Sequence, residues 1–597
     1  MRHAMIASCA LLALPIGTLR SAAAQDVNAF GNPPRLAPSP TAAAITPKDL
    51  QTRLYQFADD SMQGRQIGRV GNMKGTAYIA AEMKRLGLVP AGDNGTYFQV
   101  LPYHLRSFTN HSRLTVNGNP MTWNDEWVAV AGARAPRPVP LTEVVFGGVV
   151  GDTARQISAA QAAGKFVVLL PAPPAPAPVP GGPGGGGRGF PFGPNRFADA
   201  VAVATVDLDA LTDAQRVALN TPTVATNLGG RGAPPANPNV PVDSLALLKT
   251  QLNQLAPAAT LRLTKAAAAR LFGDKPVDGL APGTRGGTVA ASLEYLELPS
   301  DYARNVVAII PGSDSALKGQ YVAIGAHNDH VGTTTAVDKD SLKVFVDARN
   351  RMLFANKMAA LSRDQIATIK VDMDSIRRAV PKARLDSINN GADDDGSGSM
   401  AVLEIAEAIQ AMKVKPKRST LFVWHTGEEA GLLGSAFFVR NPTRPIDSIV
   451  AQINIDMIGR GRAEDVPGGG PDYVAVIGSF FDSKDLGEQV RAVNQKQAKP
   501  LLLDYKFDST TTWAGYNNIY GRSDHFNYAR EGIPIAFFST MLHADYHQRT
   551  DEAEFIDYPH YAKITSYIKD VTVDVANGPR PRINGTRPAK PPKTVVP

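Results

Sequence analysis

The second half of the chain alternates short apolar runs with amphipathic segments. Continuous runs rich in Val, Ile and Phe are typical of strands that are covered on both faces. Such runs predict six strands, at 305–310, 321–325, 420–424, 450–455, 473–477 and 534–538. Apolar residues at helical spacing predict amphipathic helices at 400–412 and 558–576. This order indicates an α/β fold with a mixed, mostly parallel central sheet flanked by helices.

The pattern changes in two other stretches, and these changes suggest a domain organisation. Short β-rich runs between 140 and 287 predict a small inserted β-rich domain, with an exposed Pro/Gly loop at 171–194 whose composition cannot bury enough apolar surface to fold. Helical spacing over 337–388 predicts a helical insertion, which is either a lid over the site or a solvated helical pair. The main domain is then expected at 47–139 and 288–577.

The first residues have the pattern of a secretory signal at 1–24. Arg2 and His3 precede an apolar stretch at 4–19, and three alanines at 22–24 form a small-residue cleavage site. The stretch is too short and too interrupted for a membrane span, which needs roughly 20 apolar residues. We therefore expect an exported protein, secreted or periplasmic, without a membrane span.

Composition narrows the class of protein further. The only cysteine, Cys9, lies in the predicted signal, so disulfides cannot stabilise the mature chain. With 44% apolar and 20% charged residues, the chain has the composition of a globular protein. Removing the two arginines of the signal lowers the formal charge from +7 to +5 (7 − 2), and several other basic groups lie in a proline-rich tail at 578–597. We expect this tail to be disordered and 25–46 to be disordered or propeptide-like, and we expect no nucleic-acid partner.

Candidate metal ligands follow several of the apolar runs. They are His327 and Asp329, the acids at 393–395, Glu428 and Glu429, Asp456, and His547. The carboxyl ends of parallel strands meet at one edge of a sheet, where ligands bind. Two imidazoles and three carboxylates suit a pair of divalent ions, above all zinc, and this mixture points to hydrolysis. Taken singly, the acids could also be a polar turn before a helix or a surface pair.

Asp329 stands two residues after His327. If both belong to one strand, their side chains point the same way. Asp329 is then expected to accept the second imidazole N–H and fix the tautomer of His327.

In their order along the chain and in their local sequence, these segments resemble the motifs of the M28 family of co-catalytic dizinc peptidases, the aminopeptidase relatives. The matching motifs are H-x-D at 327–329, G-A-D-D-x-x-S-G at 391–398, G-E-E-x-G-L-L-G-S at 427–435 and N-x-D-M-I-G at 454–459. The resemblance covers about 303–575. Residues 50–99 also resemble the start of these enzymes, and 140–287 is similar in place to their protease-associated insert.

The resemblance implies a role for each candidate ligand. Asp394 would bridge two zinc ions, His327 and Asp456 would complete one, and Glu429 and His547 the other. Asp394 is preferred to its neighbour Asp393 only by alignment with the motif, since spacing does not separate them.

Two further residues receive catalytic roles by the same resemblance. Glu428 would remain unligated and act as the general base on a metal-bridging water. Tyr546 would donate to the developing oxyanion. His330, His425 and His543 lie near the same motifs and receive no role. After His547 the chain reads Gln-Arg-Thr-Asp, which departs from the usual His-Thr-Pro.

These expectations together describe a secreted zinc exopeptidase, an aminopeptidase acting on peptides or proteins. The alternatives are a carboxypeptidase or dipeptidase of the same family, a glutaminyl-cyclase-like acyltransferase that needs one zinc, and a metal-free, receptor-like scaffold on the same fold. The sequence does not indicate the oligomeric state or the side-chain preference.

Overall fold

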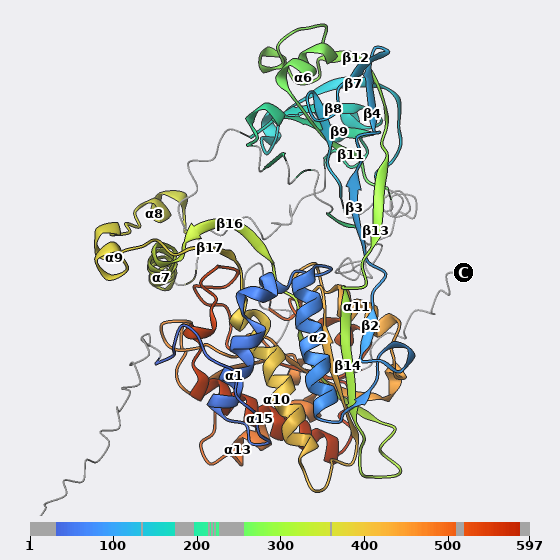
Figure 1. The fold of residues 1–597 in the computed structure, drawn as a ribbon. Coiled ribbons are helices and arrows are strands. Elements are labelled where there is room, and N and C mark those ends of the chain that lie inside the picture. Colours follow the sequence, from blue (N-terminus) through green and yellow to red (C-terminus); the bar gives the residue numbers. More distant parts are fainter. Residues whose placement is uncertain are drawn as a thin grey trace, which may run out of the picture.

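The computed structural model describes residues 31–585, apart from 133–134, 173–195, 213–214, 217–218, 220–222, 226–255, 357, 359–360 and 509–518 (Figure 1). The predicted signal at 1–24, the start of 25–46, most of the loop at 171–194 and the tail beyond 585 lie outside the described residues. Among the described helices, none is both long and apolar enough to cross a membrane.

The larger sheet has nine strands and contains all six strands that the apolar runs predict. Its order is β1 (Val89–Pro90), β14 (Arg304–Ile310), β18 (Ser419–His425), β15 (Tyr321–His327), β19 (Ile449–Ile455), β22 (Ile535–Ser539), β20 (Tyr473–Ile477) and β21 (Leu502–Asp504), with β2 (Phe98–Val100) also paired to β14. The centre, β18 to β22, is parallel, whereas β14 and β20 run antiparallel to their central neighbours. The predicted mixed α/β sheet is confirmed.

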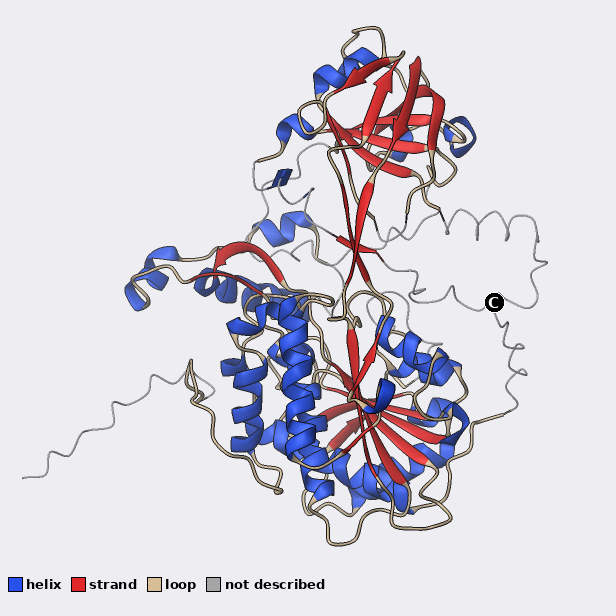
Figure 2. Cartoon of the chain, turned by 45° about the vertical axis from the view of Figure 1, so that its right-hand side comes forward, coloured by secondary structure: helices blue, strands red, loops and turns tan. Residues whose placement is uncertain are grey.

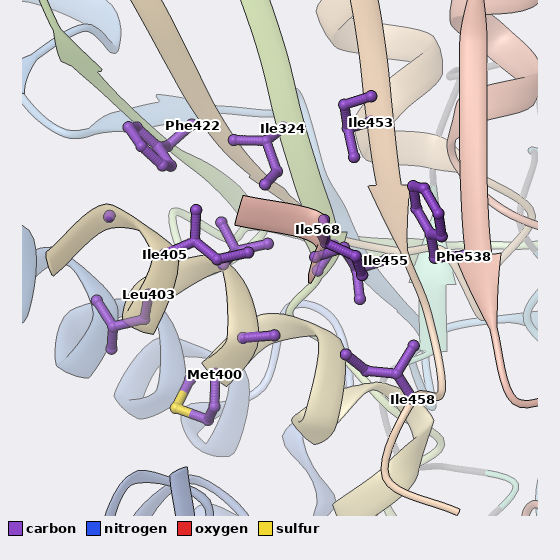
Figure 3. Packing of buried hydrophobic residues seen from close by; sticks show 14 of the residues in the cluster. Ile324, Met400, Leu403, Ile405, Phe422, Ile453, Ile455, Ile458, Phe538 and Ile568 are labelled. Carbon is purple, nitrogen blue, oxygen red and sulfur yellow. The ribbon is translucent and has the colours of Figure 1, made fainter. Parts of the chain in front are cut away.

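Helices cover both faces of this sheet. One face carries α1 (Pro47–Phe57), α2 (Val70–Arg85), α10 (Gly398–Gln410), α13 (Lys484–Gln495) and α15 (Tyr558–Asn577), and the other carries α11 (Leu433–Arg440) and α14 (His525–Arg530). Strand residues alternate between the two cores: Val306 packs on the first face and Val307 on the second. Figure 3 shows Ile405 of α10 and Ile568 of α15 in the first core. The helices predicted at 400–412 and 558–576 are confirmed.

A second sheet of eight strands stands apart from the first (Figure 2). Its order is β5 (Asn119–Met121), β4 (Arg113–Val116), β12 (Arg285–Ser292), β7 (Val139–Val149), β8 (Phe166–Leu170), β9 (Ala202–Val206), β11 (Ala259–Leu263) and β6 (Trp127–Ala129). Helices α3 (Ala159–Ala162) and α6 (Lys265–Leu271) belong to the same part of the chain. The predicted range 140–287 leaves out β4, β5 and β6, because these strands are too short to give a recognisable apolar run.

A narrow ribbon joins the two sheets. Strand β3 (His104–Phe108) pairs with β13 (Tyr295–Pro299) on one side and with β10 (Thr223–Ala225) on the other. The chain therefore enters and leaves the second sheet through neighbouring strands (Figure 1).

The insertion at 337–388 is helical, as its spacing predicts. It contains α7 (Lys339–Ala355), α8 (Arg363–Ala367) and α9 (Met373–Ala379), between the paired strands β16 (Thr333–Asp338) and β17 (Leu385–Ile388). It leaves the main body just beyond the end of β15, next to the candidate ligands. A short helix elsewhere, α12 (Ser479–Asp482), follows β20.

Candidate metal centre

The first group of ligands gathers at the carboxyl edge of the larger sheet. His327 is the last residue of β15, Asp456 directly follows β19, and Asp394 lies in the turn before α10. His327 Nε2 lies 3.1 Å from Asp394 Oδ1 and 3.7 Å from Asp456 Oδ1. These three side chains can offer one metal ion a nitrogen and two oxygens.

A second group shares Asp394 with the first. His547 Nε2 lies 3.1 Å from Asp394 Oδ2 and 3.0 Å from Glu429 Oε2. The structure thus brings all five sequence-predicted ligands together, with Asp394 between two adjacent candidate positions.

The atoms of this site fit a bound cation. Asp394 Oδ2 and His547 Nε2 are buried without a hydrogen-bond partner, and their mutual geometry is not that of a hydrogen bond. Leaving such atoms unpaired is costly, whereas a divalent cation placed between them would be ligated by both. Burial alone would raise the pKa of Asp394, but the His327 and His547 imidazoles hold it well below its ordinary value. Asp394 is therefore ionised, as a ligand must be.

Contacts also separate Asp394 from the acids beside it. Asp393 Oδ1 accepts hydrogen bonds from the Ser397 hydroxyl and from the backbone N–H of Gly459, both at 2.7 Å. Asp395 Oδ2 accepts the backbone N–H of His327 at 3.0 Å. Each neighbouring carboxylate therefore has its own partner, and the choice that sequence spacing left open falls on Asp394.

The Asp329 carboxylate was expected to accept the second imidazole N–H of His327, and this expectation is wrong. His327 Nδ1 lies 3.0 Å from the backbone carbonyl oxygen of Asp329 and 3.7 Å from its carboxylate. The strand ends at His327, so side-chain alternation does not extend to Asp329. The carboxylate instead accepts the backbone N–H of Glu428 at 3.1 Å, and burial raises the pKa of Asp329 to about 7.

Glu428 and Tyr546 lie at the same cavity. Glu428 lines it together with Asp394 and Asp456, and burial raises the pKa of Glu428 well above its ordinary value. The Tyr546 ring stacks on His547 with centroids 3.9 Å apart, and its hydroxyl accepts a hydrogen bond from Arg522 at 3.2 Å. The cavity measures about 40 Å³, and its remaining lining is mostly apolar: Met457, Ile519, Phe537, Met541 and Leu542, with the polar Ser539 and Arg522.

Sequence reasoning assigned no role to His330, which lies in the centre. Its Nδ1 donates to Glu429 Oε1 at 2.8 Å with hydrogen-bond geometry, unlike the contacts of the two ligand histidines. His330 Nδ1 also lies 3.7 Å from Asp394 Oδ2, so His330 belongs to the same group of possible metal ligands, and its hydrogen bond orients Glu429. Together with His547, it lowers the pKa of Glu429 to about 2 against the effect of burial.

Sequence reasoning also missed two residues that hold the turn of Asp394. Arg65 is fully buried and donates to the carbonyl oxygens of Asn390 at 2.6 Å and Gly391 at 2.8 Å. The Asp551 carboxylate accepts the backbone N–H of Asp394 at 3.1 Å. The Gly-Arg pair at 64–65 was a visible signal, but its partners lie 325 residues further along the chain.

Comparisons with known proteins match the part of the chain that carries these motifs. Residues 305–572 match the model of peptidase family M28. Leupeptin-inactivating enzyme 1 of Streptomyces exfoliatus is 30% identical over 175 residues, which are 29% of this chain and 34% of that protein. Leucine aminopeptidase 1 of Sclerotinia sclerotiorum is 30% identical over 187 residues, 29% of this chain and 45% of that protein. The chain thus spans a third to a half of the length of these relatives.

A solved structure, that of BSAP, a zinc aminopeptidase from Bacillus subtilis, is similar at 15% identity with a TM-score of 0.44. The alignment covers 89% of this chain and 95% of that one.

Proposed function

Since residues 305–572 match the model of peptidase family M28, we propose that this protein is a zinc-dependent aminopeptidase that hydrolyses peptides from their free amino end. One observation carries the proposal. Two candidate metal positions share Asp394, and the carboxylate of Glu428 lines the same cavity without belonging to either ligand group.

We propose zinc as the metal and two ions as its number. The donors are imidazole nitrogens and carboxylate oxygens, which zinc binds. His327 with Asp456 would hold one ion, His547 with Glu429 would hold the other, and Asp394, which lies close to both histidines, would be shared. When bound, such a metal pair polarises the carbonyl of the scissile bond and makes a bridging water more acidic.

Glu428 moves the proton in this proposal. Its carboxylate takes a proton from the attacking water as the oxygen bonds to the carbonyl carbon, and it gives that proton to the amine nitrogen when the C–N bond breaks. The N–H of Glu428, held by Asp329, keeps its backbone in place. Tyr546, which lines the same cavity, donates a hydrogen bond from its hydroxyl to the developing oxyanion.

Specificity follows from the lining of the cavity. Apolar side chains such as Met457, Phe537 and Met541 surround the space beside Glu428. Burial of apolar surface favours a substrate with an apolar first residue. The names of the curated relatives, leucine aminopeptidases among them, support this choice.

A second candidate is cleavage next to a free carboxylate, by a carboxypeptidase or dipeptidase. It is favoured by Arg522, whose guanidinium lines the same cavity and can pair with a substrate carboxylate. The glutaminyl-cyclase-like alternative would need one zinc, so a metal count separates it from a two-ion peptidase.

A substrate panel tests which end is trimmed. The panel contains leucyl-p-nitroanilide, its N-acetyl derivative, and an N-blocked dipeptide with a free carboxylate, each with and without a chelator. We expect cleavage of the first only, its loss in the chelator, and its return with added zinc. Cleavage of the N-blocked dipeptide would select the second candidate, and full activity in the chelator would contradict both.

Replacing Glu428 by Gln tests the base. We expect Glu428→Gln to bind as much zinc as the wild type and to lose about 10²- to 10⁴-fold in kcat/KM, since a positioned proton acceptor contributes about that much. Glu488→Gln on the exposed side of α13 serves as the matched control. Wild-type kcat/KM in a zinc-loaded Glu428→Gln protein would refute this role.

We also propose that the protein is exported, on the basis of the sequence pattern at 1–24. Expression of the full chain and sequencing of the mature amino terminus tests this. We expect a start at Gln25 in the exported fraction, and a retained start at Met1 would contradict the proposal.

A further inference from the structure

Helix α7 of the insertion packs against the segment that carries His547. We call residues 540–552 the His547 loop. Leu342, Phe345 and Val346 of α7 form a small buried cluster with Ala544 of this loop. The contact is therefore a packed interface, not the surface of a solvated helix.

A partly buried ion pair belongs to this interface. Lys343 Nζ of α7 lies 2.8 Å from Asp545 Oδ2, and the Asp545 side chain is fully buried. Arg460, from the segment after β19, binds the same oxygen at 3.0 Å. Asp545 is thus fixed from two sides, by the insertion and by the main body.

Asp545 in turn fixes the metal ligand. The backbone N–H of Gln548 donates to the carbonyl oxygen of Asp545 at 2.8 Å, which closes a tight turn around Tyr546 and His547. His547 has a left-handed backbone, with φ of 57°. Such a conformation is unfavourable for a residue with a Cβ and persists where surrounding contacts hold it. The position of Asp545 therefore decides where the His547 imidazole stands.

Further contacts join the same two segments. Lys339 Nζ of α7 lies 3.3 Å from Glu552 Oε1, and Arg549 donates to the carbonyl oxygen of Thr335 in β16 at 2.7 Å. The insertion and the strand that leads into it therefore contact the His547 loop on both sides of its metal ligand.

We propose that α7 positions the metal ligand His547 through the Lys343–Asp545 ion pair, so that metal binding and docking of α7 stabilise each other. Lys343 is then a positioning residue, and the insertion acts on the metal centre instead of serving only as a cover. The proposal rests on the metal pair of the proposed function but not on its peptidase activity.

Zinc affinity tests the role of Lys343. We would measure zinc binding by competition with a chromophoric chelator, together with the visible spectrum of the cobalt-substituted protein, for Lys343→Met and Lys343→Arg. We expect Lys343→Met to weaken the binding of one ion about 10- to 100-fold and to change the cobalt spectrum, since partners behind metal ligands contribute about that much. Lys343→Arg, which keeps the charge, should bind zinc like the wild type.

Arg377→Met is the matched control. Arg377 of α9 pairs with Asp338, the N-cap residue of α7. Its side chain is about as exposed as that of Lys343. We expect this variant to bind zinc normally. Unchanged zinc binding by Lys343→Met, or an equal loss in Arg377→Met, would overturn the proposal.

Hydrogen exchange of the wild-type protein provides a test that needs no variant. Because coupling is reciprocal, zinc should slow amide exchange in peptides that cover 339–355. Peptides from 259–271 in the second sheet should exchange equally in zinc and in chelator. Equal exchange of 339–355 in both conditions would overturn the proposal. Neither test uses a peptide substrate, so a protein without peptidase activity would still give a result.

Discussion

The buried carboxylates of this protein differ in the charge of the groups that surround them. Asp394 faces two imidazoles and stays ionised. Asp508, which belongs to neither ligand group, faces neutral donors: it accepts the backbone N–H of Phe481 at 2.8 Å and the Ser479 hydroxyl at 3.3 Å. Burial without a cation raises the pKa of Asp508 to about 7. The two groups therefore respond to pH in opposite directions.

Replacing Asp508 by Asn tests this difference. An unfolded Asp titrates near 3.9, so between about pH 4 and pH 7 the folded protein binds the extra proton and loses stability as the pH rises. An asparagine side chain can accept from Phe481 and donate to Ser479 without a charge. We expect Asp508→Asn to match the wild type near pH 4 and to raise the free energy of unfolding at pH 8, by on the order of 1 to 4 kcal/mol.

Urea unfolding of both proteins at the two pH values would measure this. A variant that is less stable than the wild type at pH 8 would show that Asp508 is stabilising in its charged form.

Helix α15 shows how one element is held in the fold. Its first turn is capped by the Asp557 side chain, which accepts the backbone N–H of His560 at 3.3 Å. Its apolar side packs on the sheet, where Ile568 lies among residues of β15, β19 and α10 (Figure 3). The helix owes its position to this packing, since isolated helices are marginal in water.

Shortening Ile568 measures that packing. We expect Ile568→Ala to lower the free energy of unfolding by about 2 to 5 kcal/mol, since a fully buried side chain leaves a cavity. Lys569→Ala, at the partly exposed neighbouring position, should change stability by less than about 0.5 kcal/mol. Urea midpoints would measure both, and equal losses would contradict this account of α15.

At the scale of the whole molecule, the contacts suggest that the larger sheet and its metal centre depend little on the second sheet. The chain enters it through β3 and leaves it through β13, and the backbone N–H of Thr109 donates to the carbonyl oxygen of Glu294 at 2.8 Å. Each sheet has its own buried core. All of the metal-centre residues identified above lie outside 109–294.

Removing the second sheet tests this independence. Replacing 110–293 by a short Gly-Ser turn joins two points that already lie side by side. We expect the shortened protein to fold and to bind zinc with wild-type affinity, as measured by circular dichroism and chelator competition. An insoluble product, or one that does not bind zinc, would show that the second sheet stabilises the metal centre.

Local sequence patterns by themselves determined the main strands, the fold class and the candidate ligands of this protein. The runs that became β14, β15, β18, β19, β20 and β22 were visible because strands buried on both faces are continuously apolar. The ligand candidates were visible because they stand in short motifs: His327 and Asp456 lie at the ends of strands, and Asp394 lies in the turn before a helix. The order of elements also indicated the α/β class.

Only the tertiary structure decided which of these residues act on one another. It favoured Asp394 over Asp393, turned the Asp329 carboxylate from His327 towards Glu428, and placed His330 beside Glu429. It also docked α7 on the His547 loop, which settles how an insertion of undetermined role contacts the main body. The physical reason is the same in each case. These contacts join residues tens to hundreds of positions apart, and no local periodicity records which distant partner satisfies a buried charge.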